Sequence, residues 1–247
     1  AQKHHPNPKL ISQNIANNTA QVEKPHPAVS LFNFHYATPP EAVAMNYGLN
    51  KAIGDNETGF RGTNDAPYRT EAWDFILAGG GLYNNLDYSF VAGHEDGNFV
   101  YPASQPGGGN PAFRRQLRTL VEFINGFDFI RMKPDNTVIR GGVPPGFSAR
   151  ALVQPGHAYA IYLRHGVVSK KANVAQNTKP PLPIRSSGTI EALELDLAAG
   201  TFRFQWLNPL TGRIDQEETI THGGGVRRLP CPKFSEDMAL GIRRTGR

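Results

Sequence analysis

The chain contains the run Lys51-Ala52-Ile53-Gly54-Asp55-Asn56-Glu57-Thr58-Gly59-Phe60, on which the interpretation of its neighbours depends. Two apolar residues, Ala52 and Ile53, are followed by polar residues and a glycine, and this pattern predicts a buried strand that ends in a loop. A carboxylate at such a point is a common way for an α/β protein to present a catalytic group. Glu57 is therefore the first candidate catalytic residue. The alternative is a glutamate that caps the next loop or pairs with Arg61 or Arg69.

The composition is that of a folded protein rich in strands and turns. The chain has 247 residues, with 39% hydrophobic residues, 26 glycines and 20 prolines, and no apolar run approaches the roughly 20 residues of a membrane span. The net charge of +5 comes from scattered basic residues, and the densest group, Arg243, Arg244 and Arg247, is expected in a solvated terminal tail. We therefore expect no nucleic-acid and no membrane partner. The single cysteine, Cys231, excludes an intrachain disulfide.

Residues 1–130 alternate between strand-like and helix-like segments. This alternation predicts a parallel sheet, and the repeated polar ends of the strands predict a barrel with its site at one rim. The expected strands are residues 9–14, 28–36, the run that leads to Glu57, and 81–90, and the expected helices are residues 39–49, 68–78 and 111–127. Gly107-Gly108-Gly109 is expected to be a plain loop, because it lacks the lysine of a phosphate-binding loop.

Residues 131–247 contain short strands separated by turn residues, which predicts an antiparallel β-sandwich. The expected strands are residues 149–152, 158–163, 190–197, 201–207 and 238–243. Trp206 is expected in the core of the sandwich rather than against a sugar, and the proline-rich residues 179–183 are expected in a loop or at a sheet edge. The domain boundary is therefore expected near residue 130.

The polar ends of distant strands can converge on one rim of a barrel. Glu57, His35 and Tyr36 are then the candidate catalytic residues, since a carboxylate flanked by such groups can attack an anomeric carbon. This chemistry requires no cofactor, and no metal site is expected. The candidate substrate-binding residues are Asn14, Asn84, Asp87 and Tyr88.

The pattern resembles the retaining glycoside hydrolases of clan A, whose (β/α)8 barrel often carries a C-terminal β-sandwich. The resemblance implies the C-terminal half of a TIM barrel (residues 1–130) followed by an antiparallel β-sandwich (residues 131–247). Asp55-Asn56-Glu57-Thr58-Gly59 would end the seventh strand, with Glu57 as the nucleophile, and Phe34-His35-Tyr36 would end the sixth. Ser12-Gln13-Asn14 would end the fifth strand, and Asn85-Leu86-Asp87-Tyr88 would belong to the eighth. Trp-x-Phe, Gly-Gly-Gly and Asn-Leu-Asp-Tyr-Ser-Phe also resemble uncharacterised bacterial cellulase-like proteins.

The acid/base glutamate of the clan, in an Asn-Glu pair at the end of the fourth strand, has no counterpart here. The only Asn-Glu pair is Asn56-Glu57 itself. A full barrel takes about 250 residues, so strands one to four are expected on a missing N-terminal part or another chain, and this chain alone is expected to be incomplete. Local alternatives for the second carboxylate are Asp87, Glu95 and Asp96. His94, Glu95 and Asp96 also permit a metal site, without a recognised spacing.

The resemblance implies an oligo- or polysaccharide substrate and a secreted or periplasmic protein. Two rival interpretations remain open. The chain could be a non-catalytic carbohydrate- or matrix-binding protein on a degenerate barrel, or its second half could serve only to stabilise the first.

Overall fold

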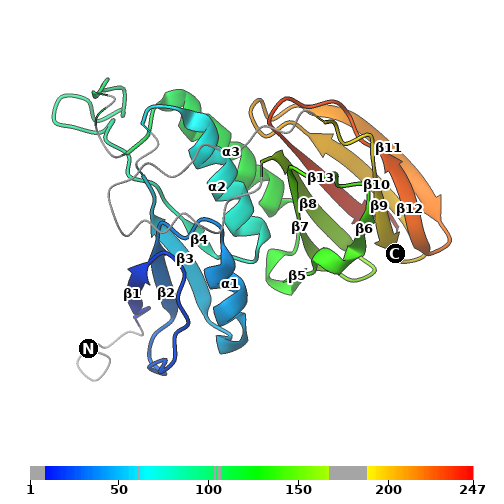
Figure 1. The fold of residues 1–247 in the computed structure, drawn as a ribbon, viewed down its shortest axis with the longest axis horizontal. Helices are drawn as coiled ribbons and strands as arrows, with labels where there is room; N and C mark the ends of the chain where they lie inside the picture. The colour runs from blue at the N-terminus through cyan, green and yellow to red at the C-terminus, as the bar shows by residue number, and fades with distance from the viewer. Residues whose placement is uncertain (1–8, 60–61, 103, 105–106, 167–187, 247) are drawn as a thin grey trace.

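The computed structural model describes residues 9–59, 62–102, 104, 107–166 and 188–246, and shows mostly sheet with few helices (Figure 1). A four-stranded sheet from the first third of the chain and the two sheets of the second half, with six and three strands, lie on either side of α2 (Asp65–Leu77) and α3 (Pro111–Asn125). The expected loop at 179–183 and the side chain of Arg61 lie outside the described residues. Across the described residues, no helix is both long and apolar enough to span a membrane.

The first sheet has four strands, which are all parallel and follow the order β1-β2-β3-β4. Its elements are β1 (Ser12–Asn17), β2 (Leu31–His35), α1 (Glu41–Asn46), the 3-10 helix η2 (Tyr47–Leu49), β3 (Ala52–Glu57) and β4 (Leu82–Tyr83). The strand expected at residues 81–90 is wrong beyond Tyr83. The backbone amide of Asn84 still donates to the carbonyl of Asp55, and that of Leu86 to the carbonyl of Thr58. After Leu86 the chain leaves the sheet as a loop.

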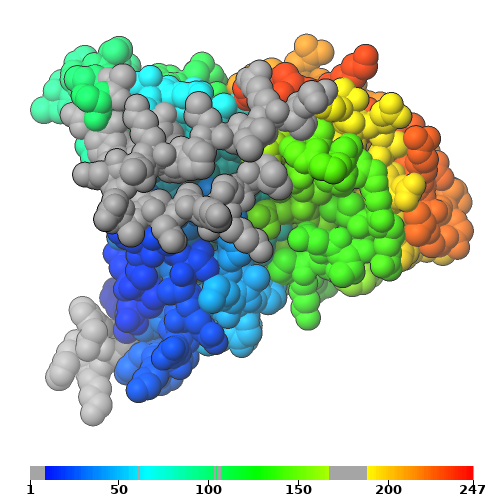
Figure 2. All heavy atoms as spheres, viewed as in Figure 1, coloured from blue at the N-terminus to red at the C-terminus, as the bar shows by residue number. Residues whose placement is uncertain are grey.

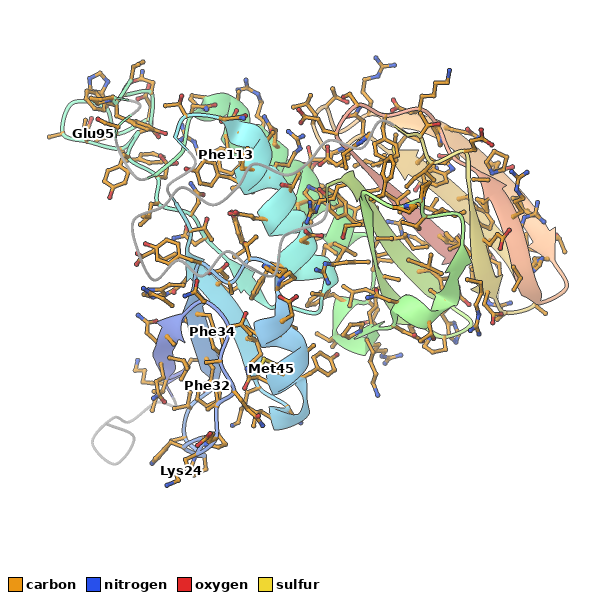
Figure 3. The ribbon with its side chains drawn as sticks, viewed as in Figure 1. Lys24, Phe32, Phe34, Met45, Glu95 and Phe113 are labelled. Carbon is orange, nitrogen blue, oxygen red and sulfur yellow. The ribbon has the colours of Figure 1, made fainter. Side chains whose placement is uncertain are left out.

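The two faces of this sheet differ in polarity, because side chains alternate between faces along each strand. Phe32, Phe34 and Ile53 point to one face and are buried against α1 and α2; Figure 3 labels the two phenylalanines. The other face carries the paired side chains of Asn14 and Asn33 on β1 and β2, with Gly54 of β3 opposite Asn33. One face is therefore the core of the sheet, and the other is built for polar contacts.

Gly54 leaves room for the buried amide of Asn33. A Cβ atom at Gly54 would lie 2.1 Å from Asn33 Oδ1, and Asn33 is held in place because its Nδ2 donates to Ser12 Oγ at 2.5 Å. We expect Gly54→Ala to lower the free energy of unfolding by about 1–3 kcal/mol, since overpacking forces neighbours out of place. Urea unfolding measures the loss, and Gly223→Ala, which would have no atom within 4 Å, is the control.

The same substitution tests the contact directly. Gly54→Ala should cost less in an Asn33→Ala background, where the obstructing amide is gone. An equal cost in both backgrounds would contradict the steric explanation.

The second half of the chain forms two antiparallel sheets, in the orders β11-β10-β13-β8-β7-β5 and β12-β9-β6. The strands are β5 (Lys133–Pro134), β6 (Ile139–Gly141), β7 (Phe147–Gln154), β8 (Ala158–His165), β9 (Ala192–Leu197), β10 (Gly200–Leu207), β11 (Ile214–His222), β12 (Gly225–Pro230) and β13 (Asp237–Arg244), with 3-10 helices η3 (Phe129–Arg131) and η4 (Asn136–Val138). One apolar cluster joins both sheets and contains Trp206, which is fully buried, so the prediction of a core tryptophan is confirmed.

The central strands β8 and β13 of the six-stranded sheet are buried on both faces. Along β8, Tyr159, Ile161 and Leu163 belong to the cluster shared with the three-stranded sheet. Tyr162 points the other way, and its ring stacks on Trp73 of α2 with centroids 5.3 Å apart. The two halves of the chain therefore pack directly on one another through α2 and α3, and Figure 2 shows their surfaces in contact.

Ion pairs buried at this contact connect α2 to the six-stranded sheet. Arg69 binds Asp237 with two hydrogen bonds of 2.9 and 3.0 Å and Glu236 with one of 2.6 Å. The alternative of a Glu57–Arg69 pair is therefore wrong. One turn further along α2, Asp74 accepts from Arg164 at 2.6 Å and from Arg150 at 3.1 Å.

The expectation of a solvated basic tail is also wrong for two of its residues. Arg243 and Arg244 belong to β13, where they form strand pairs with β10 and β8. Arg243 donates to the backbone oxygen of Gly126, and Arg244 to those of Gly156 and Ala199. These two side chains are therefore bonded to the backbone of neighbouring segments and do not extend freely into solvent.

Candidate active site

A β-bulge at Asn56 determines where the side chain of Glu57 points. In the pairing of β2 with β3, Phe34 lies opposite Asp55 and His35 lies opposite Glu57, so Asn56 is an extra residue in β3. Bulges of this kind turn the following side chain to the other face of the sheet. Asp55 therefore stays on the core face with Phe34, and Glu57 lies on the polar face with His35.

Glu57 is held by His35, the last residue of β2, and by Tyr36, which follows it. The hydroxyl of Tyr36 donates to Glu57 Oε1, and His35 Nδ1 lies 3.5 Å from Glu57 Oε2. The side chain of Glu57 is 34% exposed, so it is fixed by its neighbours and still open to solvent. The structure thus brings the three predicted catalytic residues together.

Tyr36 has an unusual backbone and a proton that is hard to remove. Its φ of 57° is in the left-handed region, which non-glycine residues rarely adopt without a structural reason. Its backbone amide also donates to the carbonyl of Glu57 at 2.8 Å. Burial and the bond to Glu57 raise the pKa of the Tyr36 phenol far above its ordinary value, so the phenol remains a donor to the carboxylate.

Asp55, two residues before Glu57, is a buried carboxyl group. It is 1% exposed, and the backbone amides of Ala37 and Tyr36 lie close enough to lower its pKa somewhat, although neither carboxyl oxygen forms a well-aligned hydrogen bond with a described residue. Burial, with a further contribution from the charge of Glu71, raises the pKa of Asp55 to about 8. Asp55 is thus mainly protonated at neutral pH, directly behind the candidate nucleophile.

This proton makes stability depend on pH. An unfolded Asp55 releases its proton near pH 4, whereas the folded protein keeps it until about pH 8. Asp55 therefore favours the folded state below pH 4, and this contribution is lost as the pH rises towards 8. We expect Asp55→Asn to remove roughly 1–3 kcal/mol of the decrease in unfolding free energy between pH 5 and pH 7.5.

Urea unfolding at several pH values measures this difference. Asp215→Asn, at an exposed position of β11, is the control and should run parallel to the unsubstituted protein. Parallel curves for Asp55→Asn would show that Asp55 carries no proton at neutral pH.

The four predicted substrate-binding residues lie in different relations to Glu57. Asn14 and Asn84 flank the bulge: Asn56 Nδ2 donates to Asn14 Oδ1 at 3.3 Å, and Asn84 Nδ2 donates to the Asn56 carbonyl at 3.2 Å. Tyr88 is 37% exposed and lies two residues after Leu86, whose backbone amide donates to the carbonyl of Thr58 at 2.9 Å. Asp87 is turned away and pairs with Arg114 at 3.1 Å.

Two residues that matter here, Asn56 and Arg114, were not identified from the sequence. Asn56 has no local signal, because a bulge is visible only in the pairing with the neighbouring strand. Arg114 lies in the helix expected at residues 111–127, where no local pattern marks it as part of a site. Its partner Asp87 lies in the loop after β4, which the sequence predicted as a strand.

The local candidates for a second carboxylate all hold the loop after β4. Asp87 binds Arg114, Glu95 accepts from the backbone amide of Gly93 at 2.9 Å, and Asp96 accepts from Asn98 at 2.7 Å. Figure 3 places Glu95 at the outer end of this loop, far from Phe34 and its sheet. Among the described residues, no group of three or more His, Cys, Asp and Glu side chains could hold a metal ion.

Comparison with known proteins finds similarity to solved structures only. The chain matches no protein-family model and no curated protein sequence. Among solved structures it is similar to a protein described as a glycoside hydrolase, with 16% identity and a TM-score of 0.51, over 79% of this chain and 43% of that one. Its structural neighbours are glycoside hydrolases.

Two further neighbours come from named bacteria. One is a glycoside hydrolase family 5 protein from Bacteroides vulgatus, with 15% identity and a TM-score of 0.48 over 78% of this chain and 42% of that one. The other is the family 30 subfamily 8 xylanase Xyn30A from Clostridium acetobutylicum, with 10% identity and a TM-score of 0.47 over 88% and 49%. At these identities the likeness concerns the fold, and this chain spans less than half the length of each neighbour.

Proposed function

We propose that this chain carries the nucleophile of a retaining glycoside hydrolase, and that the nucleophile is Glu57. The observation that supports this most is the placement of the carboxylate at the end of a parallel strand, partly exposed, between the Tyr36 hydroxyl and the His35 ring. Its neighbours fix the orientation of this carboxylate and leave it accessible to a substrate. The glycoside hydrolase neighbours support the same chemistry.

The proposed reaction has two steps. A Glu57 oxygen attacks the anomeric carbon while an acid residue protonates the glycosidic oxygen, so that the leaving sugar departs and a glycosyl ester forms. The same acid residue, now a base, then takes a proton from water, whose oxygen attacks the anomeric carbon and releases Glu57. Two inversions retain the configuration. Tyr36 and His35 orient the carboxylate, and Asn14, Asn84 and Tyr88 lie where they can contact the sugar.

We infer that the four-stranded sheet is the C-terminal half of a (β/α)8 barrel, followed by a β-sandwich. In the described part of the chain β1 and β4 each pair on one side only, so two strand edges are available for more strands. The polar face with Asn14 and Asn33 would then line the barrel. The acid residue would come from polypeptide outside these 247 residues or from another chain.

The stereochemistry of hydrolysis tests the proposal. The full-length protein that contains this chain is assayed on a panel of aryl glycosides, and proton NMR follows the anomer that is released first. We expect the anomeric configuration of the substrate, whereas an inverted product would exclude a covalent role for Glu57. Sugar binding without hydrolysis of any glycoside would favour the rival function, a non-catalytic carbohydrate-binding protein.

Removing one hydroxyl tests how Glu57 is oriented. We expect Tyr36→Phe to lower kcat/KM by about 10- to 100-fold, since a hydrogen bond to a charged group contributes ~1.5–3 kcal/mol. Tyr47→Phe is the control, because its partly exposed ring belongs to η2 behind the sheet. Equal activity in both variants would show that the Tyr36–Glu57 bond does not support the reaction.

A further inference from the structure

Arg114, on the first turn of α3, is bonded to both ends of a lobe formed by Asp87–Gly97 in the loop after β4. One of its terminal nitrogens donates to Asp87 Oδ2 at 3.1 Å and to Ser89 Oγ at 2.8 Å. The other donates to the backbone oxygens of Gly97 at 2.6 Å and Asp96 at 3.3 Å. The guanidinium carbon also lies 4.6 Å from the centre of the Phe90 ring. A single side chain thus closes the lobe.

Tyr88 lies in the sequence between Asp87 and Ser89, whose side chains both bind Arg114. On one side of it, Asp87 Oδ1 accepts from both the amide and the hydroxyl of Ser89, at 2.9 and 2.5 Å. The backbone on each side of Tyr88 is therefore fixed by the Asp87–Ser89–Arg114 contacts. Its ring packs against Tyr101, with centroids 6.3 Å apart, and remains 37% exposed.

The three glycines expected to be a plain loop complete this support. A Cβ atom at Gly107 would lie 2.5 Å from Tyr88 Cδ2, and one at Gly109 would lie 2.0 Å from Asp87 Oδ1. The backbone of this stretch therefore lies directly against the ring and the carboxylate that Arg114 holds. An aromatic ring supported from behind and open in front offers a rigid apolar face to a ligand.

Building on the proposed function, we infer that Arg114 is a positioning residue that holds Tyr88 as a platform for a sugar ring bound next to Glu57. The loop that carries Tyr88 runs along the end of β3, because the backbone amide of Leu86 donates to the carbonyl of Thr58, the residue after Glu57, at 2.9 Å. This contact brings the platform to the end of the sheet that carries Glu57. The ligand class is a pyranose whose apolar C–H face can stack on the phenol ring. Arg114 acts through Tyr88 and Asp87, and does not touch the sugar.

A comparison of single and double variants tests this role in the full-length protein. Tyr88→Ala should raise KM for an aryl glycoside about 10-fold and change kcat by less than about 3-fold, as expected for the loss of one stacking contact. Arg114→Met should give the same pattern. The double variant should be no worse than either single variant, because both changes remove one platform. Arg114→Lys should also raise KM, since an ammonium group cannot reach all four acceptors.

Arg115→Met, at the exposed neighbouring position, is the matched control and should leave KM unchanged. Additive effects of Tyr88→Ala and Arg114→Met, or a loss confined to kcat, would overturn the positioning role. Glu57→Gln separates this result from the proposed function. If Glu57→Gln leaves hydrolysis intact, the proposed function fails. If Glu57→Gln abolishes hydrolysis but Arg114→Met leaves KM unchanged, only the role of Arg114 is refuted.

Discussion

Replacing Glu57 with glutamine should lower kcat of the full-length protein by roughly 10⁴- to 10⁶-fold, which is the range seen when a catalytic nucleophile is removed. The amide has nearly the shape of the carboxylate, so the fold and the contact with Tyr36 should survive. Steady-state kinetics on the aryl glycoside identified by the panel measures the loss. Glu95→Gln is the matched control, because that glutamate is exposed in the loop after β4.

Glu57→Gly extends the same experiment. Azide can enter the space left by the side chain and attack the anomeric carbon, so added azide should restore turnover and give a glycosyl azide of inverted configuration. Turnover that azide does not change, or an azide product of retained configuration, would place the nucleophile elsewhere.

Arg69→Met should lower the free energy of unfolding by about 3–5 kcal/mol, because it leaves a buried carboxylate without its partner. Arg69 is 1% exposed, and its four hydrogen bonds reach Asp237, Glu236 and Gln116. Asp237 accepts a further bond from Tyr162 at 2.9 Å. These bonds tie α2, which directly follows the Glu57 loop, to strands β8 and β13.

Urea unfolding checks this prediction against an exposed ion pair. Arg203 and Glu217 are 2.9 Å apart and their side chains are 49% and 42% exposed, so Arg203→Met should lower the free energy of unfolding far less than Arg69→Met does. Equal losses in Arg69→Met and Arg203→Met would show that the buried pairs do not join the two halves of the chain. A large loss for Arg69→Met alone would favour a structural role for the antiparallel sheets.

The sequence was informative where a physical rule links pattern to position. Parallel strands bring their carboxyl ends to one edge of a sheet, so the polar ends at His35, Tyr36 and Glu57 could be predicted to meet, although they lie on two strands. The strands β8 and β10 were predicted from their apolar residues. Their apolar content reflects a core on one or both faces, and Trp206 belongs to that core.

The features that were missed depend on partners far away in the chain. β11 was not predicted, because it is an edge strand with mostly exposed, polar residues on both faces. The bulge at Asn56 exists only in the register with β2. Arg69 and Asp237 are 168 residues apart in the sequence, so no local pattern predicts that they form an ion pair.

Covalent trapping is the measurement that tests the central claim most directly. Dinitrophenyl 2-deoxy-2-fluoroglycosides have a leaving group that departs without a proton, so the trap requires the nucleophile but not the acid residue. Mass spectrometry of the digested protein should find one fluoroglycosyl group, attached as an ester to Glu57 in the peptide that contains β3. A label on another residue, or the same label in Glu57→Gln, would contradict the assignment of Glu57 as the nucleophile.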